Sequence, residues 1–146
     1  MSQAGIVEQT VNKIFEDMYF MFPEHIMKPE THFSIPIQCY VAKTQLKREK
    51  SAIFIYAEDH LVNQMAMNFL GEKRNFGHIE LLDIFKEAAN VIAGNYLTAS
   101  NKPPEVSFDI PVVNKTSIVS WDKDHSCQID LIYDIEKYFF RIALVV

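Results

Sequence analysis

Four strand-like segments follow one another at the end of the chain, with no helical pattern between them. Each is rich in β-branched and aromatic residues, which predicts a β-strand. The segments are VSFDIPVV (106–113), SIVSW (117–121), SCQIDLIYD (126–134) and YFFRIALVV (138–146). Two further extended segments precede them, at 33–46 and 51–58. A chain with this many strands must build its core on a sheet.

Two long helical patterns accompany these strands. Apolar residues recur at helical spacing from Gln3 to Phe22, where Pro23 ends the pattern, and again from Ile79 to Ala99, before NKPPE. A shorter helix is expected from Asp59, as its N-cap, to about Leu70, followed by the linker GEKRNFGH. We expect one α/β (α+β) domain over residues 1–146. Its sheet is mostly antiparallel, with the two long helices packed side by side on one face.

The composition is that of a globular protein and excludes several classes of partner. The 146 residues are 49% hydrophobic and 23% charged, with a net charge of −5 and a pI near 5.5. An acidic chain is a poor ligand for duplex nucleic acid or an anionic membrane. No signal peptide and no apolar run of spanning length is apparent. With Cys39 and Cys127 predicted as buried free thiols, a cytoplasmic protein is expected.

An internal echo indicates two related halves. FSIPI, at 33–37, matches FDIPV, at 108–112, with an offset of 75 residues, and each follows a long helix. AIFIYAED also resembles IDLIYDIE in pattern. Short β-like segments recur by chance, but we interpret these matches as two helix–strand halves facing each other in one fold.

The second long helix carries a narrow polar stripe. At 100° per residue, Asp83, Glu87, Asn90 and Gly94 fall within about 60° of one another, whereas apolar residues occupy most of the remaining circumference. Asn90 and Gly94 each cost a helix interior roughly 0.5–1 kcal/mol relative to alanine. An amide offers both a donor and an acceptor, and glycine leaves room for an approaching surface. The stripe therefore predicts a docking and chemistry surface.

Spacing alone is weak evidence for this site. Surface helices often carry Glu and Asn, and a second E-x-x-N occurs at Glu72 to Asn75 in the linker, where we interpret it as a decoy. No pair of histidines at i and i+4 accompanies these residues, since His25, His32, His60, His78 and His125 are scattered, so a metal site is not expected. The phosphate-loop and serine-nucleophile motifs are also absent.

The residues of the stripe resemble a known signature. The pattern D-x3-E-x2-N at Asp83, Glu87 and Asn90, followed by IAGN and by Pro111 in FDIPV, is similar to that of the CheC/CheX/FliY family of chemotaxis phosphatases. The helix and strand order over most of the chain also resembles this family, as does the two-half symmetry. The resemblance implies a CheC-like fold with pseudo-two-fold halves.

The resemblance also implies a reaction. Such a protein dephosphorylates the phosphoaspartate of a response regulator similar to CheY, which carries its own Mg²⁺. Asn90 would orient the attacking water, and Glu87 would pair with the active-site lysine of the regulator. Asp83 and Gly94 would contribute to partner binding. No cofactor bound by the chain itself is expected.

The remaining expectations concern the number of sites and the assembly. Subtracting 75 takes Glu87, Asn90 and Gly94 to Asn12, Phe15 and Tyr19, so no second Glu/Asn pair is expected and one site per chain, as in the CheX branch, is predicted. An exposed C-terminal strand, 138–146, would invite pairing with a second copy, which predicts a homodimer. The alternative function is a non-catalytic binding module that docks to a signalling or flagellar partner.

Overall fold

A single six-stranded antiparallel sheet with helices on one face forms the fold. The computed structural model describes residues 1–122 and 126–146, and in them the strand order is β1-β5-β6-β3-β2-β4. The helices are α1 (Gln3–Tyr19), α2 (Pro29–His32), α3 (Asp59–Leu70) and α4 (His78–Ala99). The strands are β1 (Glu24–His25), β2 (Ile37–Gln45), β3 (Ala52–Glu58), β4 (Val112–Ile118), β5 (Cys127–Ile135) and β6 (Tyr138–Val145). The predicted fold class is confirmed.

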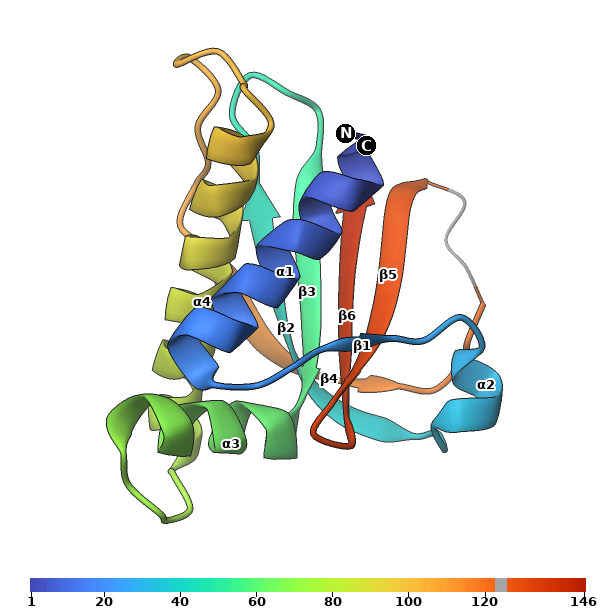
Figure 1. The fold of residues 1–146 in the computed structure, drawn as a ribbon, viewed down its shortest axis with the longest axis vertical. Helices are drawn as coiled ribbons and strands as arrows, with labels where there is room; N and C mark the ends of the chain where they lie inside the picture. Colours follow the sequence, from blue (N-terminus) through green and yellow to red (C-terminus); the bar gives the residue numbers. More distant parts are fainter. Residues whose placement is uncertain (123–125) are drawn as a thin grey trace.

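The main core lies between the sheet and the layer of α1, α3 and α4 (Figure 1). The two long helices contact each other and run antiparallel, since Gln3 at the start of α1 donates a hydrogen bond from Nε2 to the Tyr96 hydroxyl near the end of α4, at 2.8 Å. Alternate residues of β2 and β3 point toward this layer and are buried, as in Tyr40, Ala42 and Ile55. The two predicted helices therefore do lie side by side on one face.

The sheet order has the symmetry of two related halves. Read outward from the central β6–β3 pair, β5 and β1 on one side correspond to β2 and β4 on the other. The halves are thus α1-β1-β2-β3 and α4-β4-β5-β6, each of which places its first strand at the edge of the other half. The pseudo-two-fold expectation is confirmed.

The offset of 75 residues is wrong as a residue correspondence. FSIPI leads into β2, whereas FDIPV leads into β4, and these strands are not equivalent in the two halves. Between the helices, a shift of 78 residues brings buried positions into register, for example Val7 with Phe85 and Phe15 with Ala93. The positions equivalent to Glu87 and Asn90 are therefore Gln9 and Asn12, both exposed, and the prediction that α1 lacks a Glu/Asn pair is unchanged.

Helix α1 ends earlier than its apolar pattern predicts. Phe20 adopts a left-handed conformation (φ 58°) and its N–H bonds to the Phe15 carbonyl, which closes the helix three residues before Pro23. Phe22 is consequently 72% exposed and does not belong to the core face. At α3 the cap is also one residue off, because Glu58 is the N-cap and Asp59 is the first helical residue.

Two of the four predicted C-terminal strands are one strand. The polar residues between 106–113 and 117–121 belong to β4 rather than to a turn, because an edge strand with a solvent-facing side accommodates polar side chains. Segment 106–111, with Pro111 at its end, is irregular apart from a bridge between Phe108 and Leu46. The loop predicted at 23–32 contains the short elements β1 and α2.

The C-terminal strand is not an exposed edge. β6 lies between β5 and β3, and Phe139, Phe140 and Ile142 are buried. The apolar run at the end of the chain reflects a strand that is covered on both sides by neighbouring strands. The argument for a homodimer through residues 138–146 is therefore wrong, and a dimer needs a different edge.

The cysteines are not bonded to each other. Both are free thiols, Cys39 buried and Cys127 half-buried. Burial, followed by the charges of Glu58 and Asp59, raises the pKa of Cys39 to about 12, which makes it an inert core thiol. Among the described residues, no helix combines the length and the apolar character needed to cross a bilayer.

Glu58 offers a test of core electrostatics. Burial raises its pKa, partly offset by a hydrogen bond of 3.2 Å that Oε1 accepts from the Phe139 N–H. Because the folded-state pKa lies above the unfolded value, the ionised carboxylate lowers stability at neutral pH, and this cost disappears as the pH falls below about 4.5. Thermal unfolding of the Glu58→Gln variant should show a melting temperature higher by about 1–3 °C at pH 7.5. An equal gain at pH 4 would contradict this explanation.

Candidate functional site

The polar stripe faces solvent along the middle of α4. Asp83, Glu87 and Asn90 are exposed and Gly94 is half-buried, on the side of the helix opposite the buried residues. One helical turn separates Glu87 from Asn90, about 4.5 Å along the axis. The structure thus places all four predicted residues on one outward surface, as the 100° spacing predicts.

Tight packing on its inner side holds α4 in place. Its buried residues include three alanines, Ala88, Ala89 and Ala93, which allow α1 and the sheet to approach closely, and the larger Phe85 and Tyr96. At its first turn, Glu80 Oε2 accepts a hydrogen bond of 2.8 Å from the Gly77 N–H, half of a capping-box arrangement. The side chains of the stripe therefore project from a rigid element, which favours the positioning of reacting groups.

Asp83, Glu87 and Asn90 make no side-chain hydrogen bond or ion pair with any described residue of the chain. Other polar side chains of the same helix are engaged, since Asn95 Nδ2 donates to the Val91 carbonyl at 2.9 Å. A free amide and a free carboxylate on a rigid helix can both bind an external partner. This is the arrangement that the site hypothesis requires, since a side chain bonded within its own chain could not reach outward.

Tyr19 connects the stripe to the end of α1. It is only 2% exposed, and burial, followed by the negative charge of Glu87, raises the pKa of its phenol. Its backbone carbonyl accepts a hydrogen bond from Asn68 Nδ2 of α3 at 2.7 Å, and its ring lies 6.1 Å from that of Phe69. Sequence reasoning placed Tyr19 only on the core face, because periodicity does not show which helix ends meet.

Segment 106–111 partly occupies the space beside Gly94. The Phe108 ring lies 3.9 Å from the point that a Cβ at Gly94 would occupy, which is an ordinary van der Waals contact. Pro111 is buried directly before β4. The open space expected at Gly94 is therefore narrower than the sequence predicts, and an alanine would fit there.

The second E-x-x-N does not form an equivalent site. Glu72 and Asn75 lie between α3 and α4, outside any helix. Glu72 pairs with Arg74 at 2.9 Å, and Arg74 also contacts Glu80. A paired carboxylate in a loop lacks the outward, helical geometry of the stripe, so its interpretation as a decoy is confirmed.

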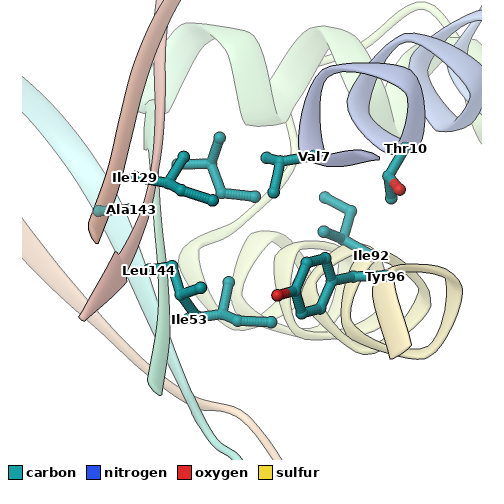
Figure 2. Close-up of a pocket in the computed structure, with 9 residues that line it drawn as sticks. Val7, Thr10, Ile53, Ile92, Tyr96, Ile129, Ala143 and Leu144 are labelled. Carbon is teal, nitrogen blue, oxygen red and sulfur yellow. The ribbon is translucent and has the colours of Figure 1, made fainter. Parts of the chain in front are cut away.

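The cavities do not resemble substrate sites for the stripe. Figure 2 shows a cavity of about 10 Å³ between α1, α4 and the sheet, lined by Val7, Ile92 and Tyr96 among others. This volume corresponds to one water, far below that of a ligand pocket. A hollow of about 390 Å³, lined in part by Trp121, Phe139 and Arg141, lies on the sheet face opposite the helices. Chemistry at the stripe must therefore use a substrate that approaches from outside.

The part of the chain that the structure describes holds no group of three or more His, Cys, Asp or Glu side chains able to bind a metal ion. Three of the histidines instead have individual partners: His32 contacts Asp134 at 2.6 Å, His25 contacts Glu8 at 3.4 Å and His78 contacts the Tyr40 hydroxyl at 3.0 Å. His125 lies outside the described residues.

Comparison with known families decides the relationship. The profile described as chemotaxis phosphatase CheX matches residues 40–132, which is more than half of the chain and includes Asp83, Glu87, Asn90 and Pro111. The chain belongs to the CheX family. The match begins within β2, so it does not include α1. No curated protein sequence matches the chain.

Solved structures of the CheX family share the fold at low identity. The CheX protein of Vibrio vulnificus is 15% identical with a TM-score of 0.71, over 99% of this chain and 96% of that one. CheX of Desulfovibrio desulfuricans is 13% identical with a TM-score of 0.71, over 99% and 98%. CheX of Borrelia burgdorferi, crystallised with CheY, BeF₃ and Mg²⁺, is 15% identical with a TM-score of 0.61, over 99% and 97%.

Proposed function

We propose that this CheX-family chain, as one domain over residues 1–146, accelerates hydrolysis of the phosphoaspartate on a CheY-like response regulator. The observation that carries the proposal is the exposed, unengaged pair of Glu87 and Asn90, one turn apart on a rigidly packed helix. Membership of the chemotaxis phosphatase CheX family supports the activity. The Borrelia burgdorferi CheX complex with CheY supports the choice of partner.

The proposed chemistry is in-line hydrolysis of an acyl phosphate. The Asn90 amide accepts a hydrogen bond from one water and orients its oxygen toward phosphorus, while the bond from phosphorus to the aspartate oxygen breaks. The products are a free aspartate carboxylate and inorganic phosphate, and the water supplies the oxygen and the protons. A carboxylate is a good leaving group, so positioning supplies most of the catalysis. The regulator contributes Mg²⁺, and this chain contributes no metal ligand.

The remaining stripe residues have docking roles in this proposal. Glu87 forms an ion pair with the active-site lysine of the regulator, which aligns the two proteins. Asp83, at the first turn of the stripe, adds a second carboxylate to the docking surface, and Gly94 leaves low relief at its far end. Because Gln9 and Asn12 on α1 do not reproduce the Glu/Asn pair, we propose one catalytic site per chain.

The decisive experiment measures the phosphate lifetime of receiver domains from the same genome. Each receiver is phosphorylated with a small phosphodonor, and loss of phosphate is followed with and without this chain. Binding is measured in parallel with receivers trapped by beryllofluoride, a mimic of the phosphoryl group. A shortened lifetime supports the phosphatase. Binding without any change of lifetime would instead establish the non-catalytic binding module.

We propose a homodimer through β4 rather than through residues 138–146. β4 lies at one edge of the sheet, with no described residue paired to its outer side, whereas the opposite edge is the two-residue β1. Ile110 and Val112, at the start of this edge, are 72% and 60% exposed. An open edge with apolar side chains is a template for pairing with a second copy.

The dimer can be tested with charged residues at this edge. Light scattering should give the wild-type protein twice the 16.9 kDa mass of one chain. The Ile110→Lys, Val112→Lys double variant should be a monomer, because lysines on an edge strand oppose strand addition. A monomeric wild-type protein, or a dimeric double variant, would contradict this assembly.

A further inference from the structure

The end of α1 and the end of α3 expose aromatic side chains beside the polar stripe. We name Phe20, Phe22, Phe69 and Leu70 the aromatic patch. Their exposed fractions are 67%, 72%, 50% and 47%, which is unusual for neighbouring large apolar residues. The patch is not explained by packing, because the adjacent Tyr19 and Met21 already fill the core beneath it.

Contacts of known geometry hold this patch together. Asn68 Nδ2 donates to the Tyr19 carbonyl at 2.7 Å, and the Tyr19 and Phe69 rings are 6.1 Å apart, so the two chain segments meet at Tyr19. Helices α1, α3 and α4 contact one another in pairs, and Figure 1 shows the C-terminal end of α1 reaching α3 beside α4. Tyr19 also lies close enough to Glu87 for that charge to raise its pKa. The patch is thus continuous with the stripe.

The stripe alone is too small to dock a protein. From Asp83 to Gly94 it is about 16 Å long, and a helix is about 10 Å wide, which gives roughly 160 Å². Even weak protein complexes bury several hundred Å² on each partner, and stable ones about 800 Å². A regulator bound at Glu87 and Asn90 must therefore cover neighbouring surface, and the aromatic patch is the apolar part of it.

Charge indicates which partner this surface accepts. Helices α1 and α4 together carry six carboxylates and two lysines: Glu8, Glu16, Asp17, Glu80, Asp83, Glu87, Lys13 and Lys86. A second copy docked here across a two-fold axis would face carboxylates with carboxylates. An anionic membrane would be repelled in the same way. A protein surface with apolar residues next to a lysine is complementary.

We infer that the aromatic patch is the apolar half of the docking site for the phosphorylated receiver domain, with the stripe as the reacting half. This inference rests on the proposed function. The patch binds the apolar surface that flanks the receiver's active-site lysine, and burying Phe20 and Phe22 there provides affinity. Aromatic anchors of this kind dominate the binding energy of many interfaces. The patch itself takes no part in hydrolysis.

The test separates binding from rate. In the Phe20→Ala, Phe22→Ala double variant the KM for the phosphorylated receiver should rise roughly tenfold, as for the loss of interface anchors, while kcat stays within about twofold. The Kd for the beryllofluoride-trapped receiver should rise by the same factor. Met27→Ala is the matched control, since Met27 is 80% exposed and follows β1, away from the stripe. It should leave both constants unchanged.

Each outcome has a defined meaning. If the double variant keeps the wild-type KM and Kd while wild-type protein shortens the phosphate lifetime, the inference is overturned and the phosphatase stands. If wild-type protein binds receivers without shortening the lifetime, and the double variant binds more weakly, the phosphatase is overturned and the docking patch stands. If the double variant changes only the oligomeric mass, the patch binds a second copy and the inference is wrong.

Discussion

The Asn90→Ala variant is expected to bind the phosphorylated regulator normally and to have lost accelerated dephosphorylation. Asn90 is exposed and has no hydrogen bond within the described chain, so its removal leaves no buried partner unsatisfied. Alanine is the better helix former by roughly 0.5–0.7 kcal/mol, so stability should be unchanged or slightly higher. Without the amide the water loses its orientation, and a fall in kcat of about 100-fold or more is expected.

The measurement is phosphate release as a function of regulator concentration, with thermal unfolding as the check on folding. Asn12→Ala is the matched control, because Asn12 is the exposed asparagine at the position of α1 equivalent to Asn90. It should retain wild-type kcat. Normal kcat in Asn90→Ala would remove this residue from the mechanism. An equal loss in both variants would mean that each half of the fold has a site, contrary to the prediction of one.

The stripe was predictable from the sequence because a helix is a local structure. Its period fixes which side chains share a face, so placing Asp83, Glu87 and Asn90 together required no knowledge of the fold. The apolar residues that surround them also showed which side would be buried. The exposure of these three side chains and the burial of Ala89 and Ile92 agree with that reasoning.

Strand pairing was not predictable, because it joins residues that are distant in sequence. Residues 138–146 are as apolar as a central strand requires, but their position at the end of the chain suggested an edge, whereas β6 pairs with β3, about 85 residues earlier. β4 was divided in two because its polar middle resembles a turn. The aromatic patch was missed for the same reason, since Phe20 and Phe69 are 49 residues apart and meet only through Tyr19 and Asn68.

The second large effect is expected at Glu87. In the proposed complex its carboxylate faces the active-site lysine of the regulator, in an interface that excludes water. Removing one partner of such a pair costs about 2–3 kcal/mol, so Glu87→Gln should raise KM by roughly 30- to 150-fold. Glu87→Lys, which places two cations together, should abolish measurable binding. Folding should survive both changes, because Glu87 is exposed and no described residue forms an ion pair with it.

Salt dependence distinguishes this local pair from the overall negative charge of the chain. Added salt screens the attraction between Glu87 and the lysine, so KM of the wild-type protein should rise between low and physiological ionic strength. The Glu87→Gln variant, which has already lost that attraction, should show a smaller rise. Glu136→Gln changes the net charge equally at an exposed position of the β5–β6 turn and should keep the wild-type salt dependence. If Glu136→Gln reduces the dependence as much as Glu87→Gln does, attraction arises from total charge, and Glu87 has no specific partner.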